Sequence, residues 1–426
     1  MFIRAHRRPR QAGLGHRPLA VAATALALAA GLSSSTTSAG ASEDGPVVTP
    51  PPGIANDCSV DVTAKINSWI NKTPDGSTLS FTPGACYRIE RTVLVKNRHG
   101  LTLEGNGAMF RAFTDGTGYV DNLQTRNHFY LWGGGDLTVR NLKIQGVNTD
   151  HRYHSEYAGQ RGFRIAGVQG ALLDNLTIFE VRGDFIEVDP DYYQTWRWSN
   201  DVTIQNSTFT YAGRQGFSIT GGRHIIFRNN TLSNPALSSF DIEPDSGTSM
   251  DAKGYPTFGG ASDVHIVNND VGPGGILFFG NVVRDSVVTK DVEISGNRLH
   301  GIPLNVWVVG HESRPYKRYS VTNNVSDTAH GGPRSAVELE YVEGAVVSGN
   351  RQPFYFATPS PVVAVRTWSS SDVVVKDNKF GGAKVVLAKD KARFGAAWRG
   401  AAGGTHVACG NRYGKPGELD VDEACA

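Results

Sequence analysis

Short runs that alternate apolar and polar residues recur along the chain, and most of them close with asparagine. Nine runs follow the form apolar-x-apolar-x-Asn, from LTVRN at 137–141 to VVVKDN at 373–378, at spacings of roughly 23 to 39 residues. A period of two indicates a half-buried strand, and Asn tolerates the left-handed backbone of a tight turn. Each run therefore predicts a short strand that ends at a turn.

A second set of strand-like segments follows these runs, about ten to twenty residues later in each repeat. The segments are GFRI (162–165), FIEV (185–188), GFSI (216–219), FDIE (240–243), ILFF (276–279), NVWV (305–308), VELE (337–340) and VAVR (363–366). Repeats of this length with several strands and no helical period predict a solenoid. We predict an all-β fold, a right-handed parallel β-helix of about nine or ten coils over 101–385. A propeller is the alternative, but its repeats need four strands each.

The segment 57–100 is expected to form an N-terminal cap and the first coil. Within it, DVTAKINSWIN (61–71) has the period of an amphipathic helix, with Asp61 as its N-cap. Its apolar face consists of Val62, Ile66, Trp69 and Ile70. Such a helix can cover the open first coil, which would otherwise present an edge for aggregation.

The first 41 residues have the pattern of a secretory signal peptide. Several arginines precede the 15-residue apolar run PLAVAATALALAAGL, and Ala39-Gly40-Ala41 supplies a small-residue cleavage pattern. The apolar run is shorter than the roughly 20 residues that span a bilayer. Residues 42–56 are rich in Ser, Thr, Gly and Pro and are predicted to be a flexible leader. A secreted, extracellular protein is expected.

The chain has four cysteines, two near each end of the expected mature protein. In an oxidising compartment this grouping favours Cys58 with Cys86 and Cys409 with Cys425, although three connectivities are possible. Residues 386–426 would then be a C-terminal segment tied by a disulfide. The net charge of +2 over 426 residues, with no basic block after the signal, disfavours nucleic acid and anionic membranes as partners, and a monomer is expected.

The stretch GDFIEVDPD (183–191) is unusual because it carries four carboxylates in nine positions. A solvated strand face is the simplest interpretation. However, the outward positions of neighbouring strands place Asp241 and Glu243 one coil beyond a coil that carries Ser218 and Thr220. Like charges on strands about 4.8 Å apart repel one another. Their accumulation on one face therefore favours a functional site.

Paired carboxylates are the groups that glycoside hydrolysis requires, one protonated and one ionised. Backbones two strands apart are separated by about 9.6 Å, which is compatible with an inverting pair made by Glu187 and Asp241. The candidate catalytic residues are Asp184, Glu187, Asp241 and Glu243. The expected partner is a polysaccharide or oligosaccharide, with no cofactor.

Further polar and aromatic residues are expected near these acids. Aromatic rings can stack on the apolar face of a sugar, and Arg or Gln can hold a hydroxyl or orient a carboxylate. The candidate substrate-binding residues are Arg161, Arg164, Asp189, Arg214, Gln215, Tyr193, Trp196 and Trp307. A structural role in loop packing or in ion pairs is the alternative for each of them.

Residues 57–385 resemble the secreted pectin-lyase-like β-helix proteins. The resemblance rests on the helical segment 61–71, the following DGSTLSFTPGACYRIERTVLVKNRHGLTLEGNG and the Asn-punctuated coils. Characterised members of that group cleave polysaccharides, so the resemblance implies the β-helix fold and carbohydrate chemistry. Tail-spike and adhesin β-helices share the architecture, because fold does not fix function.

Comparison with the polygalacturonase family, whose site uses NTD, DD, HG and RIK motifs, shows a different set of side chains. By register, Arg161 stands at the NTD aspartate and Gln215 at the histidine, whereas Asp241 and Glu243 stand at the Arg and Lys of RIK; only Asp184 is retained. Cations that would face a uronate are therefore replaced by acids. We expect a neutral or amino-sugar glycan rather than pectate or alginate.

Two alternatives remain open at this point. VDPDYYQ at 188–194 resembles a motif of alginate epimerases. Lyases and epimerases of this fold can use calcium held by acids, and here Asp184, Glu187, Asp189 and Asp241 could bind Ca²⁺. The second alternative is a glycan-binding β-helix without catalysis.

Overall fold

The computed structural model describes most of the chain after the expected signal peptide. The described residues are 45–116, 126–192, 197–244, 259–281, 289–311, 315–327, 335–353, 363–381, 383, 385–390, 405–415, 418–421 and 425. Among them, no helix is both long enough and apolar enough to cross a membrane. The predicted signal peptide, 1–41, lies outside the described residues.

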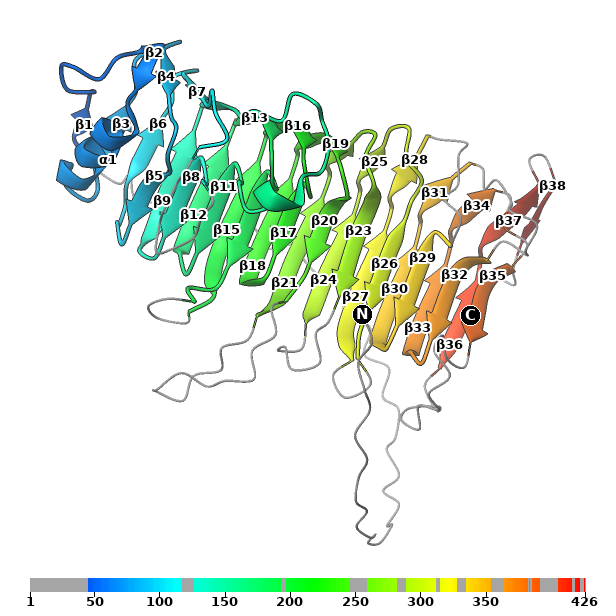
Figure 1. The fold of residues 1–426 in the computed structure, drawn as a ribbon. Coiled ribbons are helices and arrows are strands. Elements are labelled where there is room, and N and C mark those ends of the chain that lie inside the picture. The colour runs from blue at the N-terminus through cyan, green and yellow to red at the C-terminus, as the bar shows by residue number, and fades with distance from the viewer. Residues whose placement is uncertain are drawn as a thin grey trace, which may run out of the picture. The chain divides into compact units, whose positions relative to one another are not determined.

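Three long sheets make up the described part of the chain, and almost all of their strands are parallel (Figure 1). Sheet A contains β1 (Val47–Val48), β3 (Thr78–Ser80), β6 (Thr102–Glu104), β9 (Gly135–Arg140), β12 (Gln169–Asp174), β15 (Ser199–Gln205), β18 (Gly221–Arg228), β21 (Gly260–Val267), β24 (Lys290–Ser295), β27 (Tyr316–Thr322), β30 (Val342–Ser348), β33 (Ser371–Lys376) and β36 (His406–Cys409). Sheet B contains β2 (Asp57–Asp61), β4 (Cys86–Arg88), β7 (Met109–Arg111), β10 (Lys143–Gln145), β13 (Thr177–Val181), β16 (Thr208–Ala212), β19 (Thr231–Pro235), β22 (Asp270–Val271), β25 (Arg298–Leu299), β28 (Val325–Ser326), β31 (Arg351–Gln352), β34 (Lys379–Gly381), β37 (Arg412–Lys415) and β38 (Glu418–Val421). Sheet C contains β5 (Val93–Lys96), β8 (Phe129–Trp132), β11 (Phe163–Ala166), β14 (Ile186–Asp189), β17 (Phe217–Ile219), β20 (Ser238–Ile242), β23 (Ile276–Asn281), β26 (Val306–Val309), β29 (Val337–Glu340), β32 (Val363–Trp368) and β35 (Val385–Asp390).

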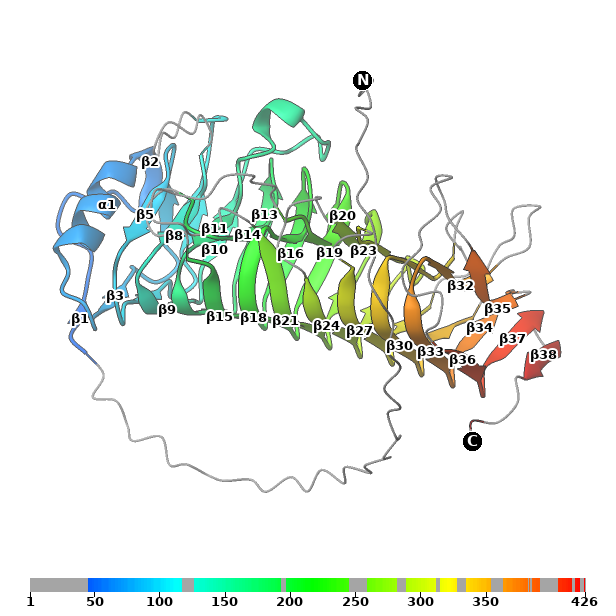
Figure 2. The same ribbon diagram turned by 90° about the horizontal axis from the view of Figure 1, so that it is seen from below.

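Each coil passes through sheet A, then sheet B, then sheet C, as in β12, β13 and β14, so the predicted parallel β-helix is confirmed. Figure 2 shows the sheet A strands β15, β18 and β21 following one another along one side. The Asn-punctuated runs are the sheet A strands, and the second predicted set is sheet C. The sequence did not reveal sheet B, because strands such as β22 have only two residues.

The coils outnumber the nine or ten expected from the sequence, since sheet C alone has 11 strands within the described residues. The difference lies at the ends. The strands β5 and β8 form coils before the first Asn-punctuated run, and β35 forms one after the last second-set segment.

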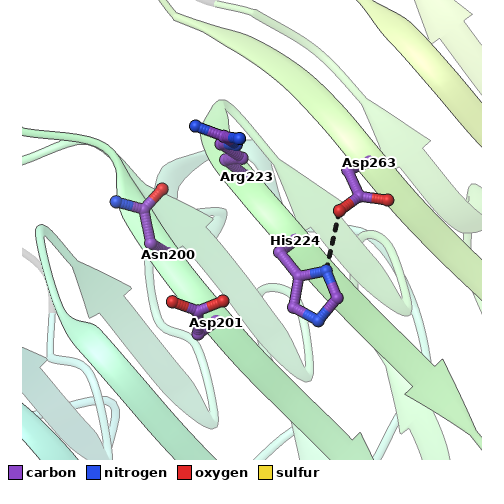
Figure 3. A pocket seen from close by; sticks show the side chains of 5 residues that line it. All are labelled: Asn200, Asp201, Arg223, His224 and Asp263. Carbon is purple, nitrogen blue, oxygen red and sulfur yellow. Dashed lines mark hydrogen bonds and ion pairs between the residues drawn. The ribbon is translucent and has the colours of Figure 1, made fainter.

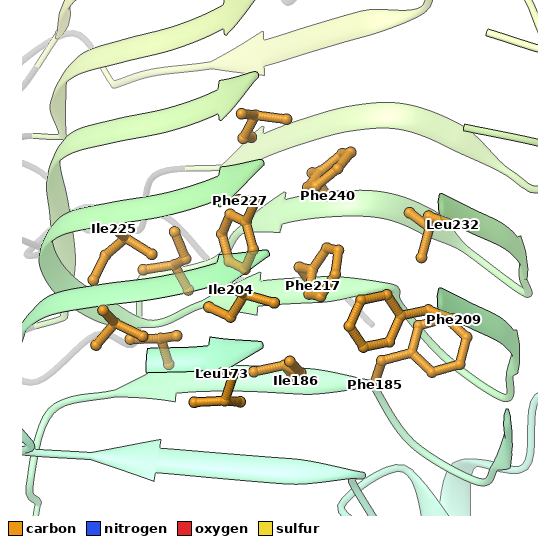
Figure 4. Packing of buried hydrophobic residues seen from close by; sticks show 14 of the residues in the cluster. Leu173, Phe185, Ile186, Ile204, Phe209, Phe217, Ile225, Phe227, Leu232 and Phe240 are labelled. Atoms are coloured by element: carbon orange, nitrogen blue, oxygen red, sulfur yellow. The ribbon is translucent and has the colours of Figure 1, made fainter. Parts of the chain in front are cut away.

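The core fills the space between the three sheets. On every second position the strands contribute apolar side chains, and aromatic rings of successive coils meet there (Figure 4). Phe217 lies with its ring centroid 4.8 Å from that of Phe209 and 5.4 Å from that of Phe240. The period-two pattern therefore fixes which residues of each strand face inward and which face outward.

Asparagines form a continuous buried ladder at the turn between sheets A and B. The side-chain amide of Asn297 donates to Oδ1 of Asn324 and to the Ile266 carbonyl, both at 2.9 Å. The same arrangement links Asn230, Asn269, Asn297, Asn324, Asn350, Asn378 and Asn411. These asparagines therefore have a structural role, because they pair buried backbone carbonyls along the solenoid.

The residue before each ladder asparagine has the left-handed backbone instead. Asn229 and Asn268 have φ values of 56°, and Gly296 has 65°. The sequence analysis did not distinguish these two adjacent positions, because Asn or Gly is common at both. One position satisfies the turn geometry, and the other satisfies buried backbone groups.

The predicted cap helix forms as α1 (Thr63–Lys72), with Ile66, Trp69 and Ile70 buried as expected. The N-cap is Val62 rather than Asp61. Asp61 still binds this end of the helix, because its carboxylate accepts the Thr63 backbone N–H at 3.0 Å and the Thr63 hydroxyl at 2.5 Å. The expected cap is therefore displaced by one residue.

The two disulfides join Cys58 to Cys86 and Cys409 to Cys425, as predicted. The prediction of a wholly flexible leader at 42–56 is wrong for its later part. Val47 and Val48 form β1, which pairs with Thr78 and Leu79 of β3, and the Thr78 N–H donates to the Pro46 carbonyl. The open edge of sheet A provides these backbone partners, which composition alone does not show.

Candidate active site

The acids identified in the sequence lie on the outward face of sheet C. In β14, Glu187 alternates with the core residues Ile186 and Val188 and therefore points away from the core. The row of directly paired outward residues is Arg164, Glu187, Ser218, Asp241, Phe279, Trp307, Glu338 and Arg366. The predicted separation of Glu187 and Asp241 by the coil of Ser218 is therefore confirmed.

Although these side chains point outward, most of the acids are buried. The exposed fraction is 0% for Asp184, 4% for Glu187, 1% for Asp189 and 2% for Asp241. Their burial argues against the solvated strand face that was the simplest interpretation of the sequence. A buried carboxylate must be paired or protonated, so the partners of each one decide its chemistry.

Two arginines of the preceding coil pair with Glu187 and Asp189. Arg161 forms an ion pair with Glu187, and Nε of Arg164 lies 2.5 Å from Asp189 Oδ2. The Thr220 hydroxyl also donates to Asp189, at 2.6 Å. Burial raises the pKa of Glu187 to about 8, and the charge of Arg161 opposes this rise. Arg161 and Arg164 thus occupy the carboxyl groups of Glu187 and Asp189, which leaves neither group free to approach a substrate.

Asp184 precedes β14 and accepts three hydrogen bonds. Its donors are the Arg214 guanidinium at 2.9 Å, the Ser218 hydroxyl at 2.7 Å and the Gln215 backbone N–H at 3.0 Å. Asp184 therefore organises the turn that carries Arg214 and Gln215.

Asp241 in β20 has a different environment, because its hydrogen-bond partner is the neutral side chain of Gln215. The Gln215 side-chain amide donates to its Oδ2, and Oδ1 has no hydrogen-bond partner among the described residues. Burial raises the pKa of Asp241 to about 8; the charges of Glu243 and Asp184 add to the rise, and Arg214 opposes it. Asp241 is consequently protonated at neutral pH and able to donate a proton.

Glu243 follows Asp241 by two residues and is the solvent-exposed acid of the group. Its side chain is 43% exposed, and it lies 2.5 Å from the Arg214 guanidinium that also binds Asp184. We call Asp184, Arg214, Gln215, Ser218, Asp241 and Glu243 the carboxylate site. It holds a protonated, buried acid beside an exposed acid that is paired with arginine.

Aromatic residues continue the row beyond the carboxylate site. Phe279 pairs with Asp241 in the strand register, and its ring centroid lies 5.2 Å from that of Trp307. Trp307 was expected from the sequence. Phe279 was not among the candidates, although its outward position in ILFF could have identified it. Tyr193 and Trp196 lie outside the described residues.

The four acids proposed as an alternative calcium site do not come together as a metal-binding group. Asp184, Glu187 and Asp189 each lie beside an arginine, which competes with a cation. Within the described part of the chain, the one group of His, Cys, Asp or Glu side chains close enough to hold an ion is His224, Asp263 and His265. That group is on sheet A, and the sequence analysis had missed it.

The family model for the right-handed β-helix region matches residues 84–271 and 127–380, which together span more than half of the chain. No curated protein matches the sequence. Structurally similar proteins belong to several functional classes.

An endo-xylogalacturonan hydrolase of Aspergillus tubingensis has a TM-score of 0.60 at 12% identity, covering 81% of this chain and 100% of its own. The A-module of a mannuronan C-5 epimerase of Azotobacter vinelandii has a TM-score of 0.58 at 14% identity, covering 87% and 93%. A surface adhesin of Streptococcus pneumoniae has a TM-score of 0.53 at 15% identity, covering 81% and 100%. At these identities the similarity shows the fold alone.

Proposed function

This chain belongs to the right-handed β-helix family, and we propose that it is a secreted glycoside hydrolase with its catalytic acids at the carboxylate site. The observation that carries the proposal is the state of Asp241. Its carboxyl is buried, its pKa is raised to about 8, and one oxygen has no partner among the described residues. A general acid must hold its proton at the working pH, and Asp241 meets this requirement.

In the proposed reaction, Asp241 donates its proton to the glycosidic oxygen as the bond to the leaving sugar breaks. Glu243, which lies beside Arg214, takes a proton from the water that attacks the anomeric carbon. Because Glu243 is the exposed member of the pair, the sugar is expected to approach from its side. Asp184 and Gln215 act as positioning residues, since Gln215 contacts both Asp184 and Asp241.

The carbohydrate-binding surface is proposed to continue along the row of sheet C, over Phe279 and Trp307. The two rings lie on the strands that follow β20, so they could contact sugars next to the one that is cleaved. The substrate-binding roles of Arg161, Arg164 and Asp189 become less direct, because these side chains pair with acids of the protein.

The test is turnover of a polysaccharide panel, followed by mass analysis of the products. Asp241→Asn and Glu243→Gln should each lower kcat by orders of magnitude. Glu243→Gln should keep stability near wild type, since an exposed ion pair contributes about 0–1 kcal/mol. Asp291→Asn is the matched control, because Asp291 forms an exposed pair with Arg318 on sheet A. Cleavage that is as fast in Asp241→Asn and Glu243→Gln as in Asp291→Asn would remove the acid assignment. Retention of a polysaccharide by wild type without any cleavage would instead favour a glycan-binding β-helix.

A further inference from the structure

A polar group on sheet A has a geometry that the proposed function does not use. The sheet A register skips one residue per strand, so Arg223 pairs with Ser262 and Ile225 pairs with Val264. The skipped residues, His224 and Asp263, have left-handed backbones with φ values of 54° and 58°. They occupy the same position on the adjacent strands β18 and β21.

Three side chains meet at this position. Nδ1 of His224 lies 2.7 Å from Asp263 Oδ2, and Nε2 of His265 lies 2.9 Å from Asp263 Oδ1. One nitrogen or oxygen atom from each residue lies within 4.8 Å of the others. Figure 3 shows His224 and Asp263 facing one another beside Asn200, Asp201 and Arg223, which line a hollow of about 330 Å³. The three side chains are therefore close together and accessible from solvent.

From this geometry we propose that His224, Asp263 and His265 bind one divalent transition-metal ion of the zinc class. Two imidazoles and one carboxylate supply three ligands of a tetrahedral site and leave the fourth position for water. Imidazole nitrogen favours Zn²⁺ and related ions, whereas Ca²⁺ and Mg²⁺ prefer sites made of oxygen atoms. The bound ion would connect the adjacent coils of β18 and β21.

A second observation supports the metal site independently. The other ring nitrogen of His265, Nδ1, lies 2.7 Å from Glu293 Oε2, and the Ser295 hydroxyl donates to Glu293 Oε1 at 2.6 Å. Metal-binding histidines commonly donate their second ring N–H to a carboxylate, which fixes the tautomer and the ring orientation. Here Glu293 leaves Nε2 of His265 directed at Asp263, as a metal ligand requires.

This site does not depend on the proposed hydrolase activity, because it lies on sheet A whereas Asp241 lies on sheet C. We expect the ion to stabilise the fold rather than to react with the sugar. A ligand that binds the folded state but not the unfolded state raises the midpoint of thermal unfolding, and the rise increases with ligand concentration.

The test is titration of the metal-free chain, prepared without a polyhistidine tag, with Zn²⁺ by calorimetry. Wild type should bind one ion per chain and show a higher Tm with zinc. His224→Ala and His265→Ala should each remove this binding, and Glu293→Gln should weaken it by about 10–100-fold. His300→Ala is the matched control. His300 also pairs with two aspartates, Asp327 and Asp270, but it is not one of the three proposed metal ligands.

Circular dichroism of each variant in the absence of metal shows whether it is folded. If zinc binds the His224→Ala and His265→Ala variants as tightly as wild type, the site is elsewhere and the proposal is wrong. Equal loss of binding in His300→Ala would likewise overturn it. X-ray absorption of the zinc-loaded chain gives an independent result, since the proposal requires two imidazole ligands on the metal.

Discussion

The side-chain amide of Gln215 donates a hydrogen bond to the carboxyl group of Asp241. Glu187 and Asp189, in contrast, have arginine partners. Burial disfavours the charged form of the Asp241 carboxyl and raises its pKa to about 8, and Gln215 brings no positive charge to oppose this rise. This difference in partners separates the proposed proton donor from the ion-paired acids of the same sheet.

Asp241 should therefore make stability depend on pH. Its pKa is raised from 3.8 to about 8, so its favourable contribution is complete below pH 3.8 and is lost as pH rises to 8. Between these values the free energy of unfolding should fall by up to about 1.4 kcal/mol per pH unit from this group. The Asp241→Asn variant should lack this decrease in the free energy of unfolding, because its amide does not titrate. Urea unfolding at pH 5, 6.5 and 8 measures the difference, and parallel curves for the two proteins would contradict the assignment.

The pH profile of catalysis provides a separate prediction. Turnover should decrease as pH rises through about 8, because Asp241 then loses the proton that it donates. Replacing Gln215 by Lys would place a cation beside this carboxyl and lower its pKa, so the alkaline limb should move to lower pH. Initial rates between pH 5 and 10 test this shift. If the alkaline limb of the pH profile stays at the same pH in Gln215→Lys, a group other than Asp241 causes it.

Arg164 should matter more for stability than an exposed arginine. Arg164→Met leaves Asp189 buried without its ion-pair partner, which typically costs about 3–5 kcal/mol. Arg318→Met is the control, since its pair with Asp291 is solvent-exposed and should contribute about 0–1 kcal/mol. Chemical denaturation of both variants measures the two losses. Similar small losses would show that Asp189 does not depend on Arg164.

The two adjacent asparagines of one turn should respond differently to substitution. Asn269→Ala removes bonds to the Asn297 side chain and to the Phe227 carbonyl, leaving buried groups unpaired at about 1–3 kcal/mol each. Asn268→Gly should be close to neutral, because Asn268 has a φ of 56° that glycine adopts readily. Thermal unfolding compares the two variants. Equal losses would mean that the ladder and turn positions are not distinct in energy.

The charge of the site also predicts the class of substrate. Arg161, Arg164 and Arg214 lie close to the acids of this face, but each of them is already paired with a carboxylate of the protein. Little positive charge remains to bind a polyuronate. We expect turnover of a neutral or amino-sugar glycan. Product release from pectate and alginate, with and without calcium, beside neutral glycans tests this, and turnover of a polyuronate alone would refute it.

The amino-acid pattern alone predicts the repeat, the outward row of sheet C and the cap helix. Each of these depends on local periodicity: apolar residues at every second position define the core face, and Asn or Gly marks the turn. The strand register then places Glu187, Ser218 and Asp241 next to one another, as the aligned repeats predicted.

The three-dimensional arrangement, in contrast, is needed to see which acids are paired with arginine and which one has a neutral partner. Arg161, Gln215 and Asp241 belong to three different coils, so their contacts with the acids depend on the course of the chain between strands. Burial of outward side chains also depends on what covers them, and period two carries no information about this. The same holds for His224 and Asp263, since the skipped residue in each sheet A strand brings them together across a gap of 39 residues. The strand pattern depends on neighbours along the chain, whereas the charge state and the polar contacts of a side chain depend on its neighbours in space.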